Sequence, residues 1–375
     1  MLTWLLTISV IIIVIGWLSG YLMLWKVPHL GGKSTNVSAD SFVSVIVPAR
    51  NEQARLKPLL DSIVKQNWRN YEIIVVDDDS TDETVLVADA YDAVTIIENR
   101  TLEEGWIGKL AACWSGAKMA RGNYLLFLDA DTRFKKEDSL HRLIAAYQDV
   151  GGRGILSLQP YHTIKHSYEN LSSIFNIIVM AGMNVFTPLG NKLKSAGSFG
   201  PCILTSKEDY FAAGGHEKIR GAVMDDFALG EAMEKMGLPV RCYGGRGLID
   251  FQMYPEGIRQ LVEGWTKNFA TASQSTHPLV MTLIICWISG GFVAIPLLIT
   301  VIITDSLFWS IIGMIGYLGY MIQFFLLARR TGNFHFIPFL VFPFLLLFFT
   351  ILFAWSFFLT NVRHSVRWRD RNIKV

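Results

Sequence analysis

The chain has 375 residues, of which 51% are hydrophobic and only 18% are charged. Soluble proteins carry about 25% charged residues, so this composition excludes an ordinary soluble enzyme and a disordered chain and favours a membrane protein. The 34 basic and 32 acidic residues nearly balance, which excludes a nucleic-acid binder with a strongly basic domain.

The first predicted element is an uncharged apolar run, Met1–Trp25. A membrane span needs about 20 apolar residues, and this run has no basic start and a long core, so we predict an uncleaved anchor. Three more apolar runs follow near the C-terminus: Leu279–Thr304, Ser306–Ala328 and Phe336–Val362. Buried helices of a soluble domain are the alternative for each run.

Residues 40–255 have the composition of a water-soluble domain. Short β-branched runs predict strands at Val43–Val47, Ile73–Val76, Val94–Ile97, Tyr124–Leu128 and Gly154–Leu158. Helical spacing predicts helices between them, at Ala54–Gln66, Asp82–Ala90, Lys109–Ala120 and Glu137–Asp149. This alternation predicts an α/β domain, with a mostly parallel sheet covered by helices on both faces. Ligands of such sheets bind at the carboxyl ends of the strands.

The predicted organisation is a membrane anchor at 1–25, the α/β domain at 40–255, an amphipathic interface segment at 256–278, membrane segments at 279–362 and a basic tail at 363–375. Within it, Leu171–Val185 and Gly257–Ala270 are predicted as helices lying in the membrane plane, with core packing as the alternative.

Basic residues predict the orientation. Lys26 and Lys33 follow the first apolar run and place the α/β domain on the cytoplasmic side of the cell membrane, and Arg329 and Arg330 fit the same side. The basic tail lies on the cytoplasmic side only if the last apolar run is a re-entrant hairpin bent near Pro343. Full crossing of the membrane by that run is the alternative.

Acidic residues gather directly after two predicted strands. Asp77-Asp78-Asp79 follows the second strand, and Asp129-Ala130-Asp131 follows the fourth. Helix capping is the alternative for any one cluster. Mg²⁺ and Mn²⁺ take carboxylate and phosphate oxygens, so Asp129 and Asp131 are candidate ligands. No G-x-G-x-x-G or G-x-x-x-x-G-K-[ST] loop opens a helix, which excludes dinucleotide-binding and P-loop enzymes.

Several motifs in order resemble glycosyltransferase family 2. They are Pro48-Ala49-Arg50-Asn51-Glu52, Asp77-Asp78-Asp79-Ser80-Thr81-Asp82, Gly108-Lys109, Leu128-Asp129-Ala130-Asp131 and Met224-Asp225-Asp226-Phe227. The resemblance covers residues 43–270 and implies an inverting, metal-dependent transferase of the GT-A fold. Asp79 departs from the family pattern, which usually has Gly at this position.

The resemblance also implies a role for each matching residue. Ala49, Glu52, Asp77 and Asp79 would line the uracil and ribose site, Lys109 would offset pyrophosphate charge, Asp129 and Asp131 would hold the phosphate and Mg²⁺ or Mn²⁺, and Asp226 would be the catalytic base. The structural alternatives are a first-turn helix acid for Glu52 and a solvated helix start for Lys109.

A closer resemblance is to the membrane-bound glycosyltransferases of bacterial carotenoid pathways. It is carried by the stretches 156–162, 182–186, 199–201, 207–210 and 263–267. It implies transfer of one glucose from UDP-glucose to the carboxylate of a C30 carotenoid acid. The implied partners are a UDP-sugar, an apolar lipid-like acceptor and the membrane, without nucleic acid. Trp265 and Lys267 are predicted to face the acceptor or the membrane interface.

Three alternative functions stay open. One is a transferase acting on a ceramide- or sterol-like lipid alcohol. Another is a polysaccharide synthase, but such enzymes carry Q-x-x-R-W and this chain has Glu263 where Arg belongs, between Gln260 and Trp265. The third is an inactive membrane scaffold that only binds nucleotide sugar, which would not need Asp129, Asp131 and Asp226.

Overall fold

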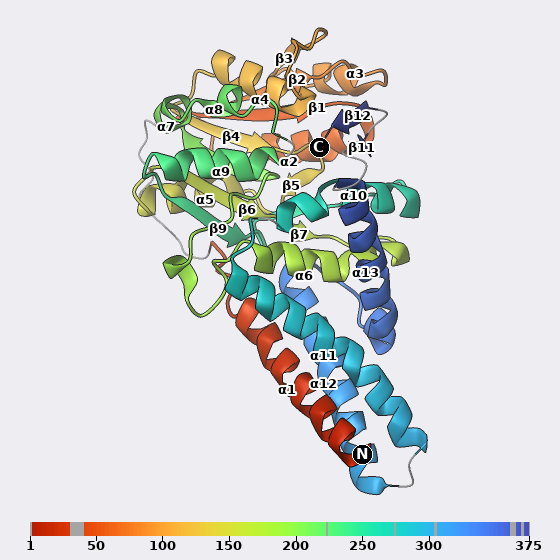
Figure 1. The fold of residues 1–375 in the computed structure, drawn as a ribbon. Coiled ribbons are helices and arrows are strands. Elements are labelled where there is room, and N and C mark those ends of the chain that lie inside the picture. The colour runs from red at the N-terminus through yellow and green to blue at the C-terminus, as the bar shows by residue number, and fades with distance from the viewer. Residues whose placement is uncertain are drawn as a thin grey trace. The chain divides into compact units, whose positions relative to one another are not determined.

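The computed structural model describes residues 2–30, 41–222, 224–273, 275–303, 306–360, 365–368 and 371–374. They form two compact units (Figure 1). We call Pro28–His162 with Ser195–Met253 the sheet unit, and Met1–Val27 with Thr163–Lys194 and Tyr254–Val375 the helical unit. Residues 163–194 lie within the predicted α/β domain in sequence, but they belong to the helical unit.

The sheet unit alternates strands with helices. Its elements are β1 (Val43–Ala49), α2 (Gln53–Val64), β2 (Tyr71–Asp77), α3 (Thr84–Asp89), β3 (Val94–Glu98), α4 (Gly108–Met119), β4 (Tyr124–Leu128), β5 (Thr132–Phe134), α5 (Ser139–Asp149), β6 (Ile155–Gln159), β7 (Tyr161–His162), β8 (Cys202–Ser206), α7 (Lys207–Ala212), α8 (Gly215–Lys218), α9 (Asp225–Lys235), β9 (Val240–Gly244) and β10 (Ile249–Phe251).

The main sheet has seven strands in the order β3-β2-β1-β4-β8-β6-β9. All neighbours pair in parallel except β8, which runs antiparallel to both β4 and β6. The prediction of a mostly parallel sheet is therefore confirmed. A smaller sheet has the order β5-β10-β7 and begins directly after the acidic turn that follows β4.

Both faces of the main sheet are covered by helices, as predicted. Val45 and Val47 of β1 pack into one core, together with apolar side chains of α2 and α5. Ile46 packs into a second core on the other face, with side chains of α4 and α9. Burial on both faces explains why β1 reads as an almost continuous apolar run.

The helical unit holds the long apolar segments. Its elements are α1 (Leu2–Met23), the 3₁₀ helix η1 (Ser167–Ser172), α6 (Ser173–Gly182), η2 (Gly190–Lys192), α10 (Ile258–Ser273), α11 (Pro278–Ile303), α12 (Leu307–Thr331), η3 (Ile337–Val341), α13 (Phe342–Phe358), β11 (Ser365–Trp368) and β12 (Arg371–Lys374). Four helical segments among the described residues are long and apolar enough to cross a membrane: Thr3–Met23, Pro278–Leu297, Leu307–Thr331 and Ile337–Phe358.

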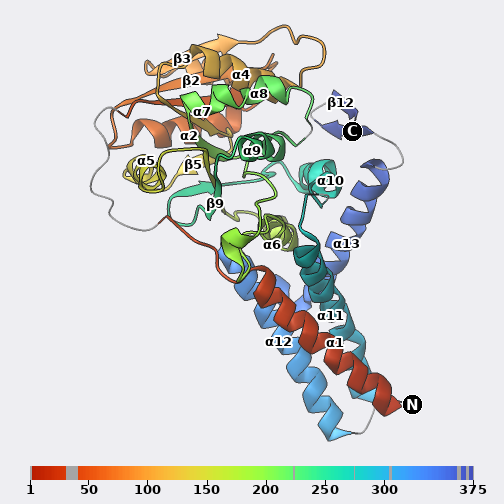
Figure 2. The same ribbon diagram turned by 60° about the vertical axis from the view of Figure 1, so that its left-hand side comes forward.

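Helices α1, α11 and α12 run side by side (Figure 2). A buried polar contact joins all three, because Gln323 of α12 donates to the Trp17 carbonyl (2.6 Å) and accepts from the Trp287 indole (3.1 Å). A Cβ at Gly16 would lie 2.5 Å from the Cys286 carbonyl oxygen, so only glycine allows α1 and α11 to approach this closely. Small residues and satisfied polar groups are typical of helix packing in membranes.

Helix α6 corrects one prediction. Eight of its ten residues are buried, and it contacts α11, α12 and α13. A helix in the membrane plane needs an exposed apolar face, so the prediction for Leu171–Val185 is wrong and the core-packing alternative holds. The sequence could not distinguish the two, since an oily segment of this length suits either environment.

Candidate active site

The acidic clusters meet at one edge of the sheet. Strands β2, β1 and β4 are parallel neighbours in that order, so their carboxyl ends lie together. Asp77 ends β2, Ala49 ends β1, and Asp129 follows β4. This is the edge at which ligands of open α/β sheets bind.

The loop after β2 contains an unsatisfied carboxylate oxygen. Asp77 accepts a hydrogen bond from the Ser80 amide through Oδ2 (3.1 Å), while its buried Oδ1 has no hydrogen-bond partner among the described residues. Asp79 has φ = 59°, a left-handed conformation that Asp tolerates better than most non-glycine residues. The departure from Gly at this position therefore keeps the backbone shape that Gly would favour.

Glu52 and Ala49 lie beside this loop with little freedom. Glu52 is buried, and one of its carboxylate oxygens is 2.7 Å from Nε of Arg55, one turn along α2. Its backbone amide donates to Thr84 Oγ1 (2.7 Å) at the start of α3. Ala49 is also buried, and its carbonyl accepts from the Asp78 amide (2.8 Å). Both residues thus hold the β1 and β2 loops together.

A lysine links the two acidic motifs of the site. Nζ of Lys109, in the first turn of α4, lies 2.9 Å from Asp129 Oδ1 and 3.4 Å from Asp225 Oδ2. Burial of the ammonium favours its neutral form, but Asp129 and Asp225 outweigh this and hold the pKa of Lys109 well above its usual value. Sequence reasoning missed the link to Asp225, because only the fold brings α4 and α9 together.

Asp226 is fixed by two backbone amides. Its Oδ2 accepts from Gly200 and its Oδ1 from Phe227, each at 3.0 Å. Burial, and then the adjacent charge of Asp225, raise the pKa of Asp226 to about 7, although Lys109 and both amides oppose the shift. A carboxyl group with this pKa can accept or release a proton near neutrality. Gly200 was predicted only as part of a resemblance stretch, with no role.

The donor atoms available for a metal ion are oxygens. Asp129 and Asp131 flank one turn after β4, and in the described ranges no cluster of three His, Cys, Asp or Glu side chains could hold a metal alone. Mg²⁺ and Mn²⁺ are commonly held by one or two carboxylates plus substrate phosphates, so this pair fits such an ion together with a diphosphate. Asp129 already pairs with the Lys109 ammonium (2.9 Å), so a metal ion bound there would share this carboxylate with Lys109.

Trp265 and Lys267 belong to the helical unit. Trp265 is 7% exposed, stacks on Phe175 of α6 with ring centroids 4.7 Å apart, and donates from Nε1 to Ser172 Oγ (2.9 Å). The backbone of Lys267 is part of α10, but its side chain lies outside the described residues. Trp265 is thus buried in protein, and a role of either residue towards an acceptor stays a prediction.

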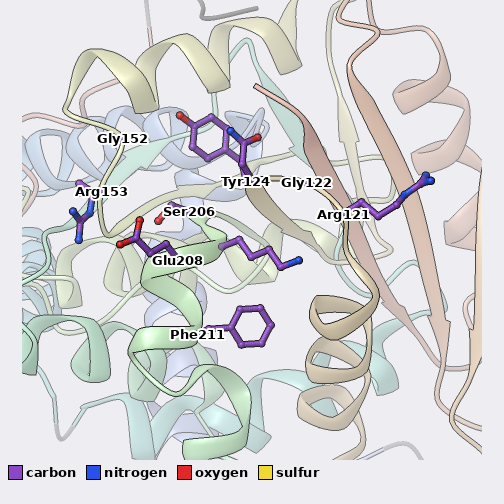
Figure 3. Close-up of a pocket in the computed structure, with 10 residues that line it drawn as sticks. Arg121, Gly122, Tyr124, Gly152, Arg153, Ser206, Glu208 and Phe211 are labelled. Carbon is purple, nitrogen blue, oxygen red and sulfur yellow. The ribbon is translucent and has the colours of Figure 1, made fainter. Parts of the chain in front are cut away.

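A pocket of about 810 Å³ lies at the opposite edge of the sheet (Figure 3). It is lined by residues at the start of β4, including Arg121 and Tyr124, and at the end of β8, including Lys207. Its basic groups are engaged: Arg121 pairs with Glu72, and Lys207 donates to the Ala120 carbonyl. The pocket lies where β4 begins, whereas the acidic site lies where β4 ends, so the two are separate.

The fold is an α/β domain with acidic side chains at the carboxyl edge of its sheet, and comparisons with known proteins give its class. The model of "Glycosyl transferase family 2" matches residues 44–206. The 4,4'-diaponeurosporenoate glycosyltransferase of Staphylococcus aureus, in strains USA300 and NCTC 8325, is 37% identical over 373 residues, covering 99% of this chain and 98% of the relative. The chain therefore belongs to glycosyltransferase family 2 and is a glycosyltransferase.

A solved structure confirms the fold. The mannosyltransferase PcManGT of Pyrobaculum calidifontis, determined with GDP-Man and Mn²⁺, superposes with a TM-score of 0.53. The match covers 95% of this chain and 97% of that chain at 17% sequence identity. The predicted GT-A class is thus confirmed.

Gly108 gives a prediction for this site. A Cβ at Gly108 would clash with the buried carboxylate of Asp78, so Gly108→Ala should displace that carboxylate or the start of α4, and with it Lys109. Misplacement of a charge by about 1 Å can cost roughly hundredfold in rate, which is the loss we expect in kcat/KM. Gly221→Ala is the control, because its added methyl would meet only the Gly105 carbonyl oxygen, at 3.6 Å. Equal activity of both variants would contradict the close packing.

Proposed function

We propose that this enzyme transfers one glucose from UDP-glucose to the carboxylate of a carotenoid acid resembling 4,4'-diaponeurosporenoate, with inversion at the anomeric carbon. The observation that carries the acceptor is the 37% identity, across 99% of the chain, to the S. aureus enzyme of that name. The donor and the stereochemistry are supported by the acidic motifs at the sheet edge.

The donor would bind along the carboxyl ends of β2, β1 and β4. The buried Oδ1 of Asp77 would accept from an N–H group of the uracil ring, and this would satisfy an oxygen that is otherwise costly to bury. Asp79 is more than half exposed and suits a ribose hydroxyl. Glu52, paired with Arg55, would line the uracil and ribose site together with Ala49.

The diphosphate would lie against Lys109, Asp129 and Asp131. Bound Mg²⁺ or Mn²⁺ would supply charge neutralisation for the leaving diphosphate. Lys109, held between Asp129 and Asp225, adds a fixed positive charge next to the same group. Charges fixed before the reaction stabilise a transition state without reorganisation.

The acceptor step forms one bond and breaks another. An acceptor oxygen attacks the anomeric carbon from the face opposite UDP, the carbon–oxygen bond to the diphosphate breaks, and UDP leaves with the electron pair. A carboxylate acceptor with a pKa near 4 is already ionised at neutral pH, so no proton has to be removed. Asp226 would then orient the acceptor and order the loop at Gly200.

Asp226 distinguishes the two acceptor classes. With a carboxylate acceptor, Asp226→Asn should cost only about tenfold, because the general-base contribution of roughly 10²–10⁴ is not needed. Between pH 6 and 8, transfer should stay level or fall, since ionisation of Asp226 near pH 7 adds a negative charge beside an anionic acceptor. The measurement is kcat/KM against pH for the unaltered enzyme and for Asp226→Asn. Glu231→Gln, exposed on the same helix, is the control.

A transferase acting on a lipid alcohol is the second candidate, and the pKa of Asp226 favours it. An alcohol must lose its proton, and a base with a pKa of about 7 suits that task. Under this function, activity would rise with pH through about 7 as Asp226 ionises, and Asp226→Asn would lose roughly a hundredfold or more. That outcome would replace the carotenoid acid by a lipid alcohol.

A polysaccharide synthase is less favoured. Glu263, at the position of the synthase arginine, is 52% exposed at its side chain and pairs with Arg259 across one turn of α10 (3.0 Å). We therefore propose one sugar per acceptor.

We also propose a multi-pass arrangement in the cell membrane with the sheet unit on the cytoplasmic side. Arg330 donates to the carbonyls of Leu24 and Trp25, so the C-terminal ends of α1 and α12 lie together. Lys26 and Arg329 are next to the same ends. Basic residues concentrate on the cytoplasmic side of membrane helices, and α1 leads into the sheet unit from this end.

A further inference from the structure

The last apolar segment folds back along α12. The ring of Phe336 lies 5.1 Å from that of Phe325, and the Leu340 carbonyl accepts from the Tyr317 hydroxyl (2.8 Å). The ring of Phe342 then lies 4.9 Å from that of Tyr317. Phe342 also lies 5.2 Å from Phe324 and 6.2 Å from Tyr320, so between 336 and 342 the contacts on α12 extend from Phe325 back to Tyr317. The segment therefore runs antiparallel to α12, from near its C-terminal end towards its middle.

The segment extends only part of the way along α12. Tyr317 lies fourteen residues before Thr331, the end of α12, which corresponds to about 21 Å of helix at 1.5 Å per residue. Helix α13 begins at Phe342 with Pro343 in its first turn, where the missing amide costs nothing. The chain thus turns within the depth of the bundle and does not reach the far end, where α11 and α12 are joined.

Helix α13 then returns to the level at which the segment started. At the start, the His335 amide donates to Asn170 of η1 (2.9 Å). At the end, Ser356 donates to the Thr266 carbonyl of α10 (2.7 Å). Helices η1 and α10 are themselves joined, since Trp265 donates to Ser172. Both ends of the hairpin therefore lie at one end of the helical unit.

The hairpin exposes apolar side chains that continue the apolar surface of the bundle. Ile337 is 75% exposed, Val341 58%, Phe344 59% and Ile351 59%. Helices α11 and α12 expose Ile299, Ile311 and Ile315 in the same way, each by more than half. A surface of this kind in a membrane protein is covered by lipid hydrocarbon.

We propose that residues 332–358 form a re-entrant hairpin whose exposed apolar surface contacts the acyl chains of one leaflet, the leaflet around the C-terminal ends of α1 and α12. Only α1, α11 and α12 cross the membrane. The segment Ile337–Phe358 is long and apolar enough to cross, but its helix α13 starts in the middle of the bundle and ends on the side from which the segment entered.

Charge gives independent support. The tail contains Arg363, Arg367, Arg369, Arg371 and Lys374, which a fourth crossing would place on the side opposite Lys26, Arg329 and Arg330. A re-entrant hairpin places all of these residues on one side, in agreement with the charge bias of membrane proteins. The inference does not depend on which sugar or acceptor the enzyme uses.

Cysteine labelling in sealed vesicles tests the topology. His335→Cys marks the base of the hairpin, Ser306→Cys the connection between α11 and α12, and Ser365→Cys the tail. The full-length chain is treated with a membrane-impermeant maleimide in right-side-out and inverted vesicles, and labelled peptides are read by mass spectrometry. We expect positions 335 and 365 to label in one vesicle type and 306 in the other. Labelling of 365 together with 306, or of all three from one side, would overturn the hairpin.

A spin label tests whether lipid covers the hairpin. Leu340 is 47% exposed at the turn, so a label on Leu340→Cys should be relaxed strongly by oxygen and weakly by a water-soluble nickel complex. Weak relaxation by both would mean that protein, such as a second copy of the chain, covers the turn. Strong relaxation by the nickel complex would place it in water. Either result would overturn contact with the leaflet.

Discussion

Replacing Asp131 with Ala should reduce sugar transfer by about a thousandfold or more, while the chain stays in the membrane. A cation at the departing diphosphate supplies several kcal/mol of transition-state stabilisation, and each 1.4 kcal/mol is about tenfold in rate. Asp131 is a cleaner test than Asp129, because Asp129 also holds Lys109 and its loss would have two causes.

The measurement is transfer from radiolabelled UDP-glucose by purified membranes, with and without EDTA and with Mg²⁺ or Mn²⁺ restored. In the unaltered chain, EDTA should abolish transfer and either ion should restore it. The Asp131→Ala variant should not respond to added metal. Asp92→Ala, an exposed acid of the sheet unit, should behave as the unaltered chain. Full activity of Asp131→Ala would refute the metal assignment.

Lys109→Ala should lower kcat by roughly a hundredfold to a thousandfold, the cost of removing one preorganised charge or donor from a transition-state site. Two effects combine in this variant. The diphosphate loses a fixed positive charge, and Asp129 and Asp225 lose the cation that lies between them. Lys109→Arg should recover part of the activity, since it restores the charge with a different shape.

Lys118→Ala is the matched control, because Lys118 is exposed in the last turn of the same helix. Asp225→Asn should weaken the hold on Lys109 and cost less than the loss of the lysine itself, about tenfold, since one of its two carboxylate partners remains. If Lys109→Ala changed neither kcat nor KM, Lys109 would only stabilise the start of α4.

Local sequence patterns predicted the part of the fold that carries the donor site. Strand β4 matches its predicted bounds, Tyr124–Leu128, and the other four predicted strands differ by at most two residues at either end. Strands β1, β2, β4 and β6 are mostly buried, so they appear in the sequence as short apolar runs, whereas the edge strand β3 is only partly buried. Because β2, β1 and β4 are parallel neighbours, the acidic residues that follow β2 and β4 had to meet at one edge.

Features that depend on contacts between distant segments were not predictable. Strand β8 inserts antiparallel between β4 and β6, and Gly200, just before it, supplies an amide to Asp226. No periodicity marks either fact. The same holds for α6, whose oily sequence suits a membrane surface as well as the protein core it occupies. The sequence also does not distinguish a re-entrant hairpin from full crossing of the last apolar run, because Pro343 is compatible with a bend and with the first turn of a helix.

The most direct test is to incubate purified membranes with UDP-glucose and a C30 carotenoid acid and to isolate the product. We expect one glucose per acceptor, in the β configuration from the α-linked donor, joined by an ester that mild alkali cleaves. The corresponding carotenoid alcohol should be a poor acceptor. An alkali-stable glucoside formed from a lipid alcohol, with the carotenoid acid left unchanged, would contradict the proposed function.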